Sequence, residues 1–337
     1  MADPGSPVTD DFRSEITTLL VIGAGPAGLT VGIAAEQQEI PCIILDRATV
    51  VGTIERYPLG MTFFSTPERL EIGGIPFIAS HEKPTRRDGL LYYRRVAEHF
   101  ELDVRPGEEV TSVTRDSHEH FRIMVRGRDG RKVYLAEAVV FATGYYDWPN
   151  SLGIPGEDLP HVHHYFREGH PFWHQNVVVV GAGNSAVDAA LECWRAGAQV
   201  TIVHFGHEFD RTVKSWVLPD ITNRVREESI VARWGARLTG ITPGEVEIEL
   251  EDGARERFPC DAVLAMTGYH ADTRMLLALG VPVDSAGVPA HDPDSLATPM
   301  RGIYLAGVIA AGNEANRLFI ENTRHHGEAI VRDFMKR

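Results

Sequence analysis

A glycine-rich turn near the N-terminus constrains the fold of this chain most. The apolar run at residues 19–22 leads directly into Gly-Ala-Gly-Pro-Ala-Gly at residues 23–28, which is the pattern of a buried parallel strand that turns sharply into a helix. Gly23 permits the tight turn, Gly25 lets the backbone approach a pyrophosphate, and Gly28 lets the helix pack closely on the strand. The helix N-terminus offers free N–H groups to phosphates. The stretch therefore predicts a dinucleotide site.

An acidic residue stands where such a site requires one. A second apolar run, residues 42–45, ends at Asp46, 23 positions after Gly23. In a dinucleotide fold a carboxylate at this place accepts hydrogen bonds from the ribose hydroxyls. A glycine turn in some other α/β fold is the alternative, and the acid in register argues against it.

The same pattern occurs a second time, at residues 177–186. Ala186 replaces the third glycine, which the motif tolerates. The position equivalent to Asp46 is His204, and basic residues follow it at His207, Arg211 and Lys214. A histidine tolerates a 2′-phosphate that an acid would repel, so we expect FAD or NAD at the first site and NADPH at the second. The alternative is that these basic groups form a solvated loop.

Two strands that run into Thr-Gly turns, at residues 139–146 and 263–270, complete the two units. Each follows its glycine motif after a stretch that is typical of β-ribbons, and the chain crosses between units near Pro149 and again near residues 271–273. The C-terminal segment has a strand that ends at Gly307 and a helical pattern from 318 to 335. We therefore expect an α/β protein with two Rossmann-like, three-layer dinucleotide-binding domains. The expected boundaries are a mobile tail (1–15), a discontinuous FAD domain (16–149 and 272–337) and an inserted NAD(P)H domain (150–271).

Charge and cysteine content exclude several function classes. The formal net charge of −14 argues against binding to nucleic acid or to anionic membranes, which both favour clustered Lys and Arg. Cys42, Cys193 and Cys260 form no Cys-x-x-Cys pair and have no metal-ligand spacing, and His-x-His-His at 161–164 does not fix a metal geometry, so no metal is expected. So sparse a set of cysteines indicates a reducing, cytoplasmic compartment.

Together these motifs resemble the two-domain FAD/NADPH flavoproteins of the thioredoxin reductase type, and most of all the bacillithiol disulfide reductase subfamily. The resemblance covers the chain from about Thr17 to its end and implies that the NADPH domain is inserted in the FAD domain. The motifs that carry it are at 57–58, 62–65, 72–73, 75–77, 142–146, 164–166, 183–186, 216, 218–219, 306–313 and 319–322.

The chain also departs from the family pattern. It has no Cys-x-x-Cys before the second glycine motif, which excludes reduction of thioredoxin by an internal dithiol. Ala27 stands where many members of the subfamily have a cysteine, Val308 stands where the wider family has an aspartate, and Phe205 stands where the subfamily often has an arginine. No catalytic residue is therefore assigned.

The predicted cofactor sites consist of the glycine turns, nearby acidic and aromatic residues, and the N-terminus of the C-terminal helix. For FAD we expect Gly23, Gly25, Pro26, Ala27, Gly28, Asp46, Arg47, Tyr57, Phe63, Phe64, Thr143, Gly144, Tyr146, Gly307, Val308, Phe319 and Ile320. For NADPH we expect Gly181, Gly183, Asn184, Ser185, Ala186, His204, Arg211, Lys214, Thr267 and Gly268.

The function predicted is hydride transfer from NADPH to FAD and onward to an acceptor. The resemblance implies a low-molecular-weight disulfide such as bacillithiol disulfide, and a homo-oligomeric assembly. Three alternatives stay open: electron transfer to a small carrier protein, as in ferredoxin– or flavodoxin–NADP reductases; a flavin monooxygenase; and a redox-sensing binding module. The like charge of acidic carriers argues against the first, and a missing Phe-x-Gly-x-x-x-His pattern argues against the second.

Overall fold

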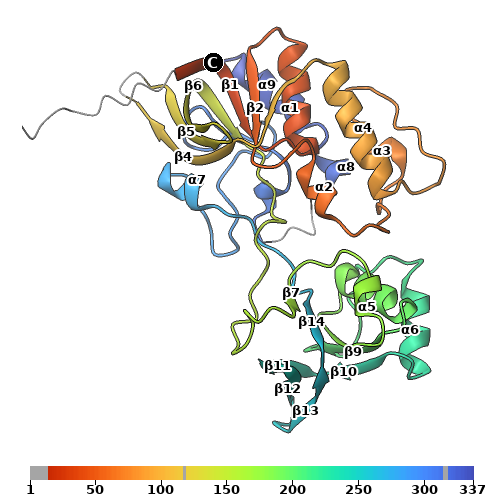
Figure 1. The fold of residues 1–337 in the computed structure, drawn as a ribbon. Helices are drawn as coiled ribbons and strands as arrows, with labels where there is room; N and C mark the ends of the chain where they lie inside the picture. The colour runs from red at the N-terminus through yellow and green to blue at the C-terminus, as the bar shows by residue number, and fades with distance from the viewer. Residues whose placement is uncertain (1–13, 117–118, 314–317) are drawn as a thin grey trace, which may run out of the picture. The chain divides into compact units, whose positions relative to one another are not determined.

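The computed structural model describes residues 14–116, 119–313 and 318–337, and these form two compact units (Figure 1). Apart from those gaps, the first unit comprises residues 14–55, 65–147 and 270–337, and the second comprises Arg56–Phe64 and Trp148–Tyr269. The NAD(P)H domain predicted at residues 150–271 overlaps the second unit but leaves out Arg56–Phe64. This segment joins the second unit because, for example, the Leu59 N–H donates to the Arg167 carbonyl oxygen at 2.9 Å.

The first unit is built on a mixed sheet of order β3-β2-β1-β6-β5-β4, with β15 paired to β6. The alternation of buried residues in β5 and the continuous burial at the end of β1 match a sheet whose parallel part is covered on both faces. Its core includes Leu20, Phe121, Phe141 and Leu305. The strands are β1 (Ser14–Ile22), β2 (Cys42–Asp46), β3 (Asp103–Pro106), β4 (Glu109–Arg115), β5 (Phe121–Gly127), β6 (Gly130–Phe141) and β15 (Ile303–Leu305).

Helix α1 (Pro26–Glu36) follows β1 and is buried along most of its length. Helix α9 (His326–Phe334) packs on it, and a close approach at Gly327 allows this: a Cβ there would lie 2.1 Å from the Thr30 carbonyl oxygen. The other helices of this unit are α2 (Gly52–Arg56), α3 (Pro67–Leu70), α4 (Arg86–His99), α7 (Arg274–Ala278), the 3₁₀ helix η2 (Gly307–Ala311) and α8 (Ile320–Thr323).

The second unit has a parallel sheet of order β10-β9-β8-β14-β7 and an antiparallel sheet of order β11-β12-β13. A core that includes Val177, Ala190, Ile202 and Leu264 joins the parallel sheet to α5. The elements are β7 (Val162–His163), η1 (His170–Phe172), β8 (Asn176–Val180), α5 (Asn184–Arg195), β9 (Gln199–His204), α6 (Leu218–Arg226), β10 (Val231–Trp234), β11 (Ala236–Thr242), β12 (Gly244–Leu250), β13 (Arg255–Cys260) and β14 (Ala262–Ala265). The mixed sheet of the first unit, the parallel sheet of the second and their flanking helices confirm the predicted α/β fold class.

Two local predictions differ from the structure. Ser14 and Glu15, assigned to the tail, begin β1, where Arg105 pairs with the Glu15 carboxylate; residues 1–13 lie outside the described part of the chain. The single C-terminal helix expected at 318–335 is two helices, α8 and α9, separated at Arg324 and His325. No helix in the described ranges has the length and apolar character needed to cross a bilayer.

Candidate functional site

The first glycine turn is shaped by close contacts on one side and open space on the other. Gly23 has φ +114°, and a Cβ there would lie 2.4 Å from the Ala142 carbonyl oxygen. A Cβ on Gly28 would lie 1.9 Å from the Gly23 carbonyl oxygen, whereas a Cβ on Gly25 would meet nothing within 4 Å. Gly25 caps α1, and Pro26 occupies its first turn. The N-terminus of α1 therefore faces a space that suits a phosphate group.

Asp46 is held across this turn by two backbone amides. Its Oδ2 accepts from the Ala24 N–H and its Oδ1 accepts from the Ala48 N–H, each at 2.8 Å. Burial raises the pKa of Asp46. Each carboxylate oxygen keeps a second acceptor position, so the group can also bind a ribose hydroxyl.

Thr143 adds an unsatisfied polar atom to the same turn. Its backbone nitrogen lies 3.4 Å from the position of a Cβ on Gly23, and its Oγ1 is buried with no hydrogen-bond partner among the described residues. Such a group costs about 1–3 kcal/mol if it stays unpaired. The neighbouring Gly144 has φ +69° and open space where a Cβ would lie. The orphaned hydroxyl and the open glycines fit a bound FAD.

Gly307, Ala27 and His326 meet at the end of β15. Gly307 has φ +80°, and a Cβ there would lie 2.8 Å from the Ala27 Cβ. The Gly307 N–H donates to His326 Nδ1 at 3.1 Å. Burial, together with His291 and His325, lowers the pKa of His326 to about 4. The imidazole is therefore neutral at pH 7, with its proton on Nε2. His326 was not predicted, because it lies far along the chain from Gly307 and no motif contains it.

The remaining residues predicted for FAD are distributed over both units. In the first unit Tyr146 is buried, Val308 is partly buried, and Phe319, which precedes Ile320 at the start of α8, is exposed. Arg47 pairs with Asp147 at 2.6 Å. Tyr57, Phe63 and Phe64 belong to the second unit, where the Phe64 ring centre lies 5.7 Å from that of Trp216. Their role at FAD stays a prediction.

The second glycine turn repeats the geometry of the first. Gly181 has φ +122°, and a Cβ there would lie 2.5 Å from the Met266 carbonyl oxygen. Gly183 caps α5, as Gly25 caps α1. An Asp210 carboxylate oxygen lies 3.1 Å from the position of a Cβ on Gly183, so a carboxylate occupies the side of the turn that a pyrophosphate would approach.

The residues around this turn are tied to one another. Asn184 Nδ2 donates to the Thr212 carbonyl oxygen at 2.9 Å, and Asn184 Oδ1 accepts from the Lys214 N–H at 2.9 Å. Ala186 is buried and Ser185 is exposed. Thr267 Oγ1 donates to the Asn150 carbonyl oxygen at 2.5 Å, and Gly268 follows with φ +85°.

The three basic side chains predicted for the NADPH phosphate differ in their surroundings. His204 is buried, and burial lowers its pKa. The Lys214 Nζ lies 2.7 Å from an Asp188 carboxylate oxygen. Arg211 is exposed. The structure therefore leaves Arg211, among these three, as the cation open to solvent.

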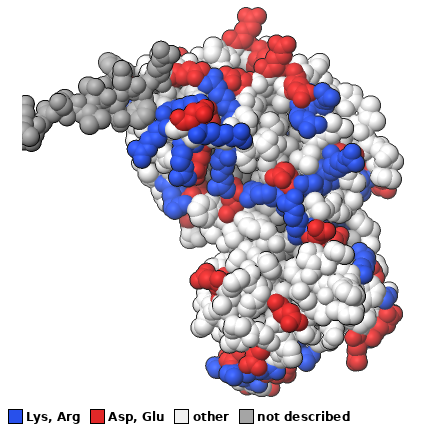
Figure 2. Space-filling view, in the orientation of Figure 1, with Lys and Arg blue, Asp and Glu red and all other residues white. Residues whose placement is uncertain are grey.

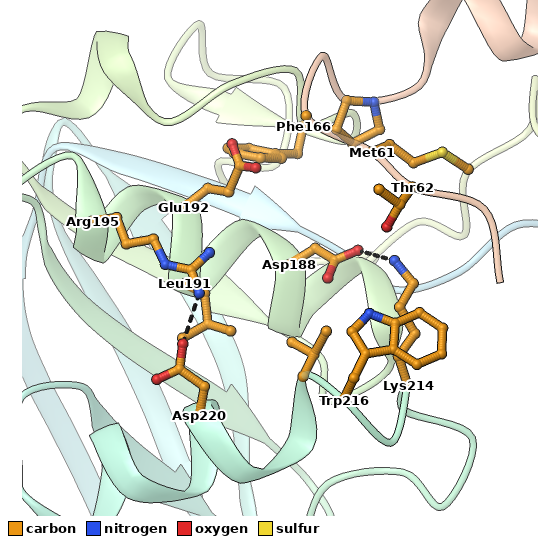
Figure 3. Close-up of a pocket in the computed structure, with 13 residues that line it drawn as sticks. Met61, Thr62, Phe166, Asp188, Leu191, Glu192, Arg195, Lys214, Trp216 and Asp220 are labelled. Carbon is orange, nitrogen blue, oxygen red and sulfur yellow. Dashed lines mark hydrogen bonds and ion pairs between the residues drawn. The ribbon is translucent and has the colours of Figure 1, made fainter. Parts of the chain in front are cut away.

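Lys214 instead lines a cavity of about 270 Å³ in the second unit (Figure 3). The cavity lies between α5, the loop that precedes α6, and residues 58–62. Two ion pairs face it, Lys214 with Asp188 and Arg195 with Asp220, each at 2.7 Å. It presents both signs of charge to a small polar molecule.

None of the cysteines is a reactive thiolate. All three are free, and Cys193 and Cys260 are fully buried. Burial raises the pKa of Cys42 and of Cys193 to about 12 and that of Cys260 to about 11. A thiol with so high a pKa does not attack a disulfide at neutral pH.

Comparison with known proteins places this architecture in a family. Residues 20–307 match the family described as pyridine nucleotide-disulphide oxidoreductase. The bacilliredoxin reductase Bdr of Bacillus subtilis is 41% identical over 94% of this chain and 97% of its own.

Two solved structures agree with this assignment. The bacillithiol disulfide reductase Bdr (YpdA) from Bacillus cereus superposes with a TM-score of 0.93 at 41% identity and covers 96% of this chain and 99% of its own. The Staphylococcus aureus enzyme superposes with a TM-score of 0.91 at 38% identity, with the same coverage. These matches confirm the predicted resemblance. The chain belongs to the pyridine nucleotide-disulphide oxidoreductase family and is a flavoprotein reductase whose cofactors are FAD and NADPH.

Proposed function

We propose that this enzyme reduces a low-molecular-weight disulfide, bacillithiol disulfide above all, at the expense of NADPH. One NADPH, one proton and one disulfide give one NADP⁺ and two thiols. When bound, FAD supplies the two-electron chemistry between the nicotinamide and the disulfide. The similarity to two bacillithiol disulfide reductases, at 38–41% identity, supports this substrate.

The burial and the raised pKa values of the cysteines indicate how the electrons reach the disulfide. Cys193 and Cys260 are buried and Cys42 is partly buried, all three thiols have raised pKa values, and Ala27, which lies beside Gly307, offers no thiol. Disulfide reduction by a protein thiol requires an accessible thiolate. The electrons therefore pass to the disulfide without a protein mixed disulfide.

The chain's own residues hold and orient the cofactor. The amides at the start of α1, the Asp46 carboxylate and the orphaned Thr143 hydroxyl offer donors and acceptors to FAD. The neutral His326 fixes the backbone of Gly307 through Nδ1. Its remaining ring proton, on Nε2, is not committed to that bond.

The charge distribution favours a small substrate over an acidic carrier protein. Basic side chains gather over β4, β5 and β6 on the face shown in Figure 2, and several of them pair with neighbouring acids. Arg115 pairs with Glu119 at 2.9 Å, and Lys132 pairs with Glu108 at 2.6 Å. These pairs reduce the net positive charge that could attract an acidic protein.

A variant without thiols tests this proposal. In Cys42→Ala/Cys193→Ala/Cys260→Ala we expect kcat for the disulfide to stay within about threefold of wild type, because no thiol takes part. Flavin content and thermal unfolding of the same sample verify that the variant is folded. Loss of disulfide turnover in a folded, fully flavinylated variant would contradict direct transfer.

The predicted homo-oligomeric state and cytoplasmic compartment form part of the same proposal. Light scattering of the purified enzyme tests the first, and cell fractionation tests the second. A monomer, or recovery outside the cytoplasm, would correct those two points without changing the chemistry.

A further inference from the structure

The first residue of the loop after β9 is Phe205, so this position offers no arginine to bind a 2′-phosphate. His204 ends β9 and is buried, and Phe205, which follows it, is 57% exposed. Lys214 is committed to Asp188. A cation for the phosphate must therefore come from elsewhere in the second unit or from further along this loop.

Strand β11 begins beside that position. Strands β9 and β10 are parallel, with Trp234 opposite His204 in register. The Gly235 N–H then donates to the Gly206 carbonyl oxygen at 2.9 Å, which joins the end of β10 to the loop after β9. Because β11 starts at Ala236 and contacts β9, its first residues lie at the carboxyl end of β9.

Arg237 extends from this strand over Phe205. Its guanidinium carbon lies 4.7 Å from the centre of the Phe205 ring, which is within the range of a cation–π contact. The Arg237 charge also reaches His204 and helps burial to lower the pKa of that histidine. Arg237 is thus fixed next to the residue that stands in the place of the ribose-binding acid.

The charge of Arg237 is not neutralised by an ion pair with any residue that the structure describes. Glu249 lies opposite Arg237 in the β11–β12 register, but its carboxylate binds Arg255 at 3.0 Å. Arg233, on the adjacent β10, pairs with Glu256 at 3.0 Å. The five N–H donors of Arg237 remain available to an anion.

We propose that Arg237 binds the 2′-phosphate of NADPH and so selects it over NADH. In this fold the adenosine ribose lies at the carboxyl end of the second strand of the unit, here β9. A guanidinium held over Phe205 can bind a phosphate there through two N–H groups. This places the arginine on β11 rather than in the loop, and it deepens the assignment of NADPH as cofactor.

Carboxylates near Phe205 would repel the 2′-phosphate, so its binding requires a cation that offsets them. The charge of Asp210 reaches His204, and Glu251 Oε1 lies 3.2 Å from His207 Nε2. Both would repel a dianionic 2′-phosphate. Arg237 compensates for them, and Arg211 is the rival for this role because it is also exposed.

Binding of two small nucleotides separates these possibilities. Titration calorimetry of the full-length holoenzyme with 2′,5′-ADP and with 5′-AMP measures the phosphate contribution directly, independently of turnover. For Arg237→Met we expect the affinity for 2′,5′-ADP to fall by about tenfold or more, as for loss of a charge-assisted contact, with the affinity for 5′-AMP unchanged. The KM for NADPH rises by a similar factor, while kcat and the KM for NADH stay as in wild type.

Three variants make the test decisive. Arg233→Met, which removes a neighbouring arginine already paired with Glu256, should leave both nucleotide affinities unchanged. Arg237→Lys should restore part of the 2′,5′-ADP affinity. Equal loss of both nucleotides in Arg237→Met, or a selective loss in Arg211→Met alone, would overturn the proposal. Reoxidation of dithionite-reduced enzyme by the disulfide requires no NADPH, so failure there would count against the proposed function and not against Arg237.

Discussion

The environment of His326 keeps its imidazole neutral at the turn that Gly307 makes. Nδ1 accepts the Gly307 N–H, and burial lowers the pKa of His326 to about 4. The unfolded chain has an ordinary histidine pKa of about 6.5. Protonation therefore favours the unfolded state, and the stability contributed by the neutral form is present above pH 6.5 and is lost as the pH falls toward 4.

Replacing this histidine removes that pH dependence. A glutamine can still accept the Gly307 N–H but does not titrate. When the pH falls from 7 to 5, we therefore expect the free energy of unfolding of His326→Gln to decrease by about 2 kcal/mol less than that of wild type. Urea unfolding at the two pH values measures this. An identical pH dependence in both proteins would show that His326 is not held neutral.

Local patterns predicted the glycines well and the long-range partners poorly. Gly23 and Gly181 could be predicted because a tight strand-to-helix turn imposes φ above +100° on one residue of a short motif. His326 and Arg237 could not, because each acts on a residue that is 19 or more positions away in the chain. The burial of His204 also escaped prediction, since it depends on packing against Trp234.

At the scale of elements, α1 is fixed between the sheet and α9. Its buried residues, which include Leu29, Val31 and Ile33, extend around the helix and leave almost no polar face. A helix of this kind is stable only when it is covered on several sides. Gly327 makes the cover possible by letting the α9 backbone approach Thr30.

Gly327→Ala tests this contact, because close packing and helix propensity predict changes of opposite sign in the free energy of unfolding. In an open helix, glycine to alanine stabilises by about 1 kcal/mol. Here the new Cβ would meet the Thr30 carbonyl oxygen at 2.1 Å, so we expect Gly327→Ala to lower the free energy of unfolding by about 1–3 kcal/mol.

The exposed neighbour Glu328 provides the control in the same helix. Glu328→Ala should change the stability by less than about 0.5 kcal/mol. A stabilised Gly327→Ala variant would contradict the close packing of α9 on α1. The division of the C-terminal segment into α8 and α9 was not predicted, because its helical periodicity continues through Arg324 and His325.

At the scale of the whole molecule, two dinucleotide units serve one reaction. Their architecture could be predicted from the repeated motif, because each repeat forms its own sheet and core. The membership of Arg56–Phe64 in the second unit could not, since it depends on contacts such as that between Leu59 and Arg167. The net charge of −14 and the ion pairs of Arg115, Arg126 and Lys132 in the first unit agree with a small substrate.

We propose that electrons pass from NADPH through FAD to a small disulfide without a protein thiol. The most direct measurement is anaerobic stopped flow: the enzyme is reduced with one equivalent of NADPH and mixed with bacillithiol disulfide while flavin absorbance is followed. We predict reoxidation at a rate at least equal to kcat, in wild type and in the variant without cysteines alike. A flavin that stays reduced with the disulfide but is reoxidised by a ferredoxin or flavodoxin would contradict the account.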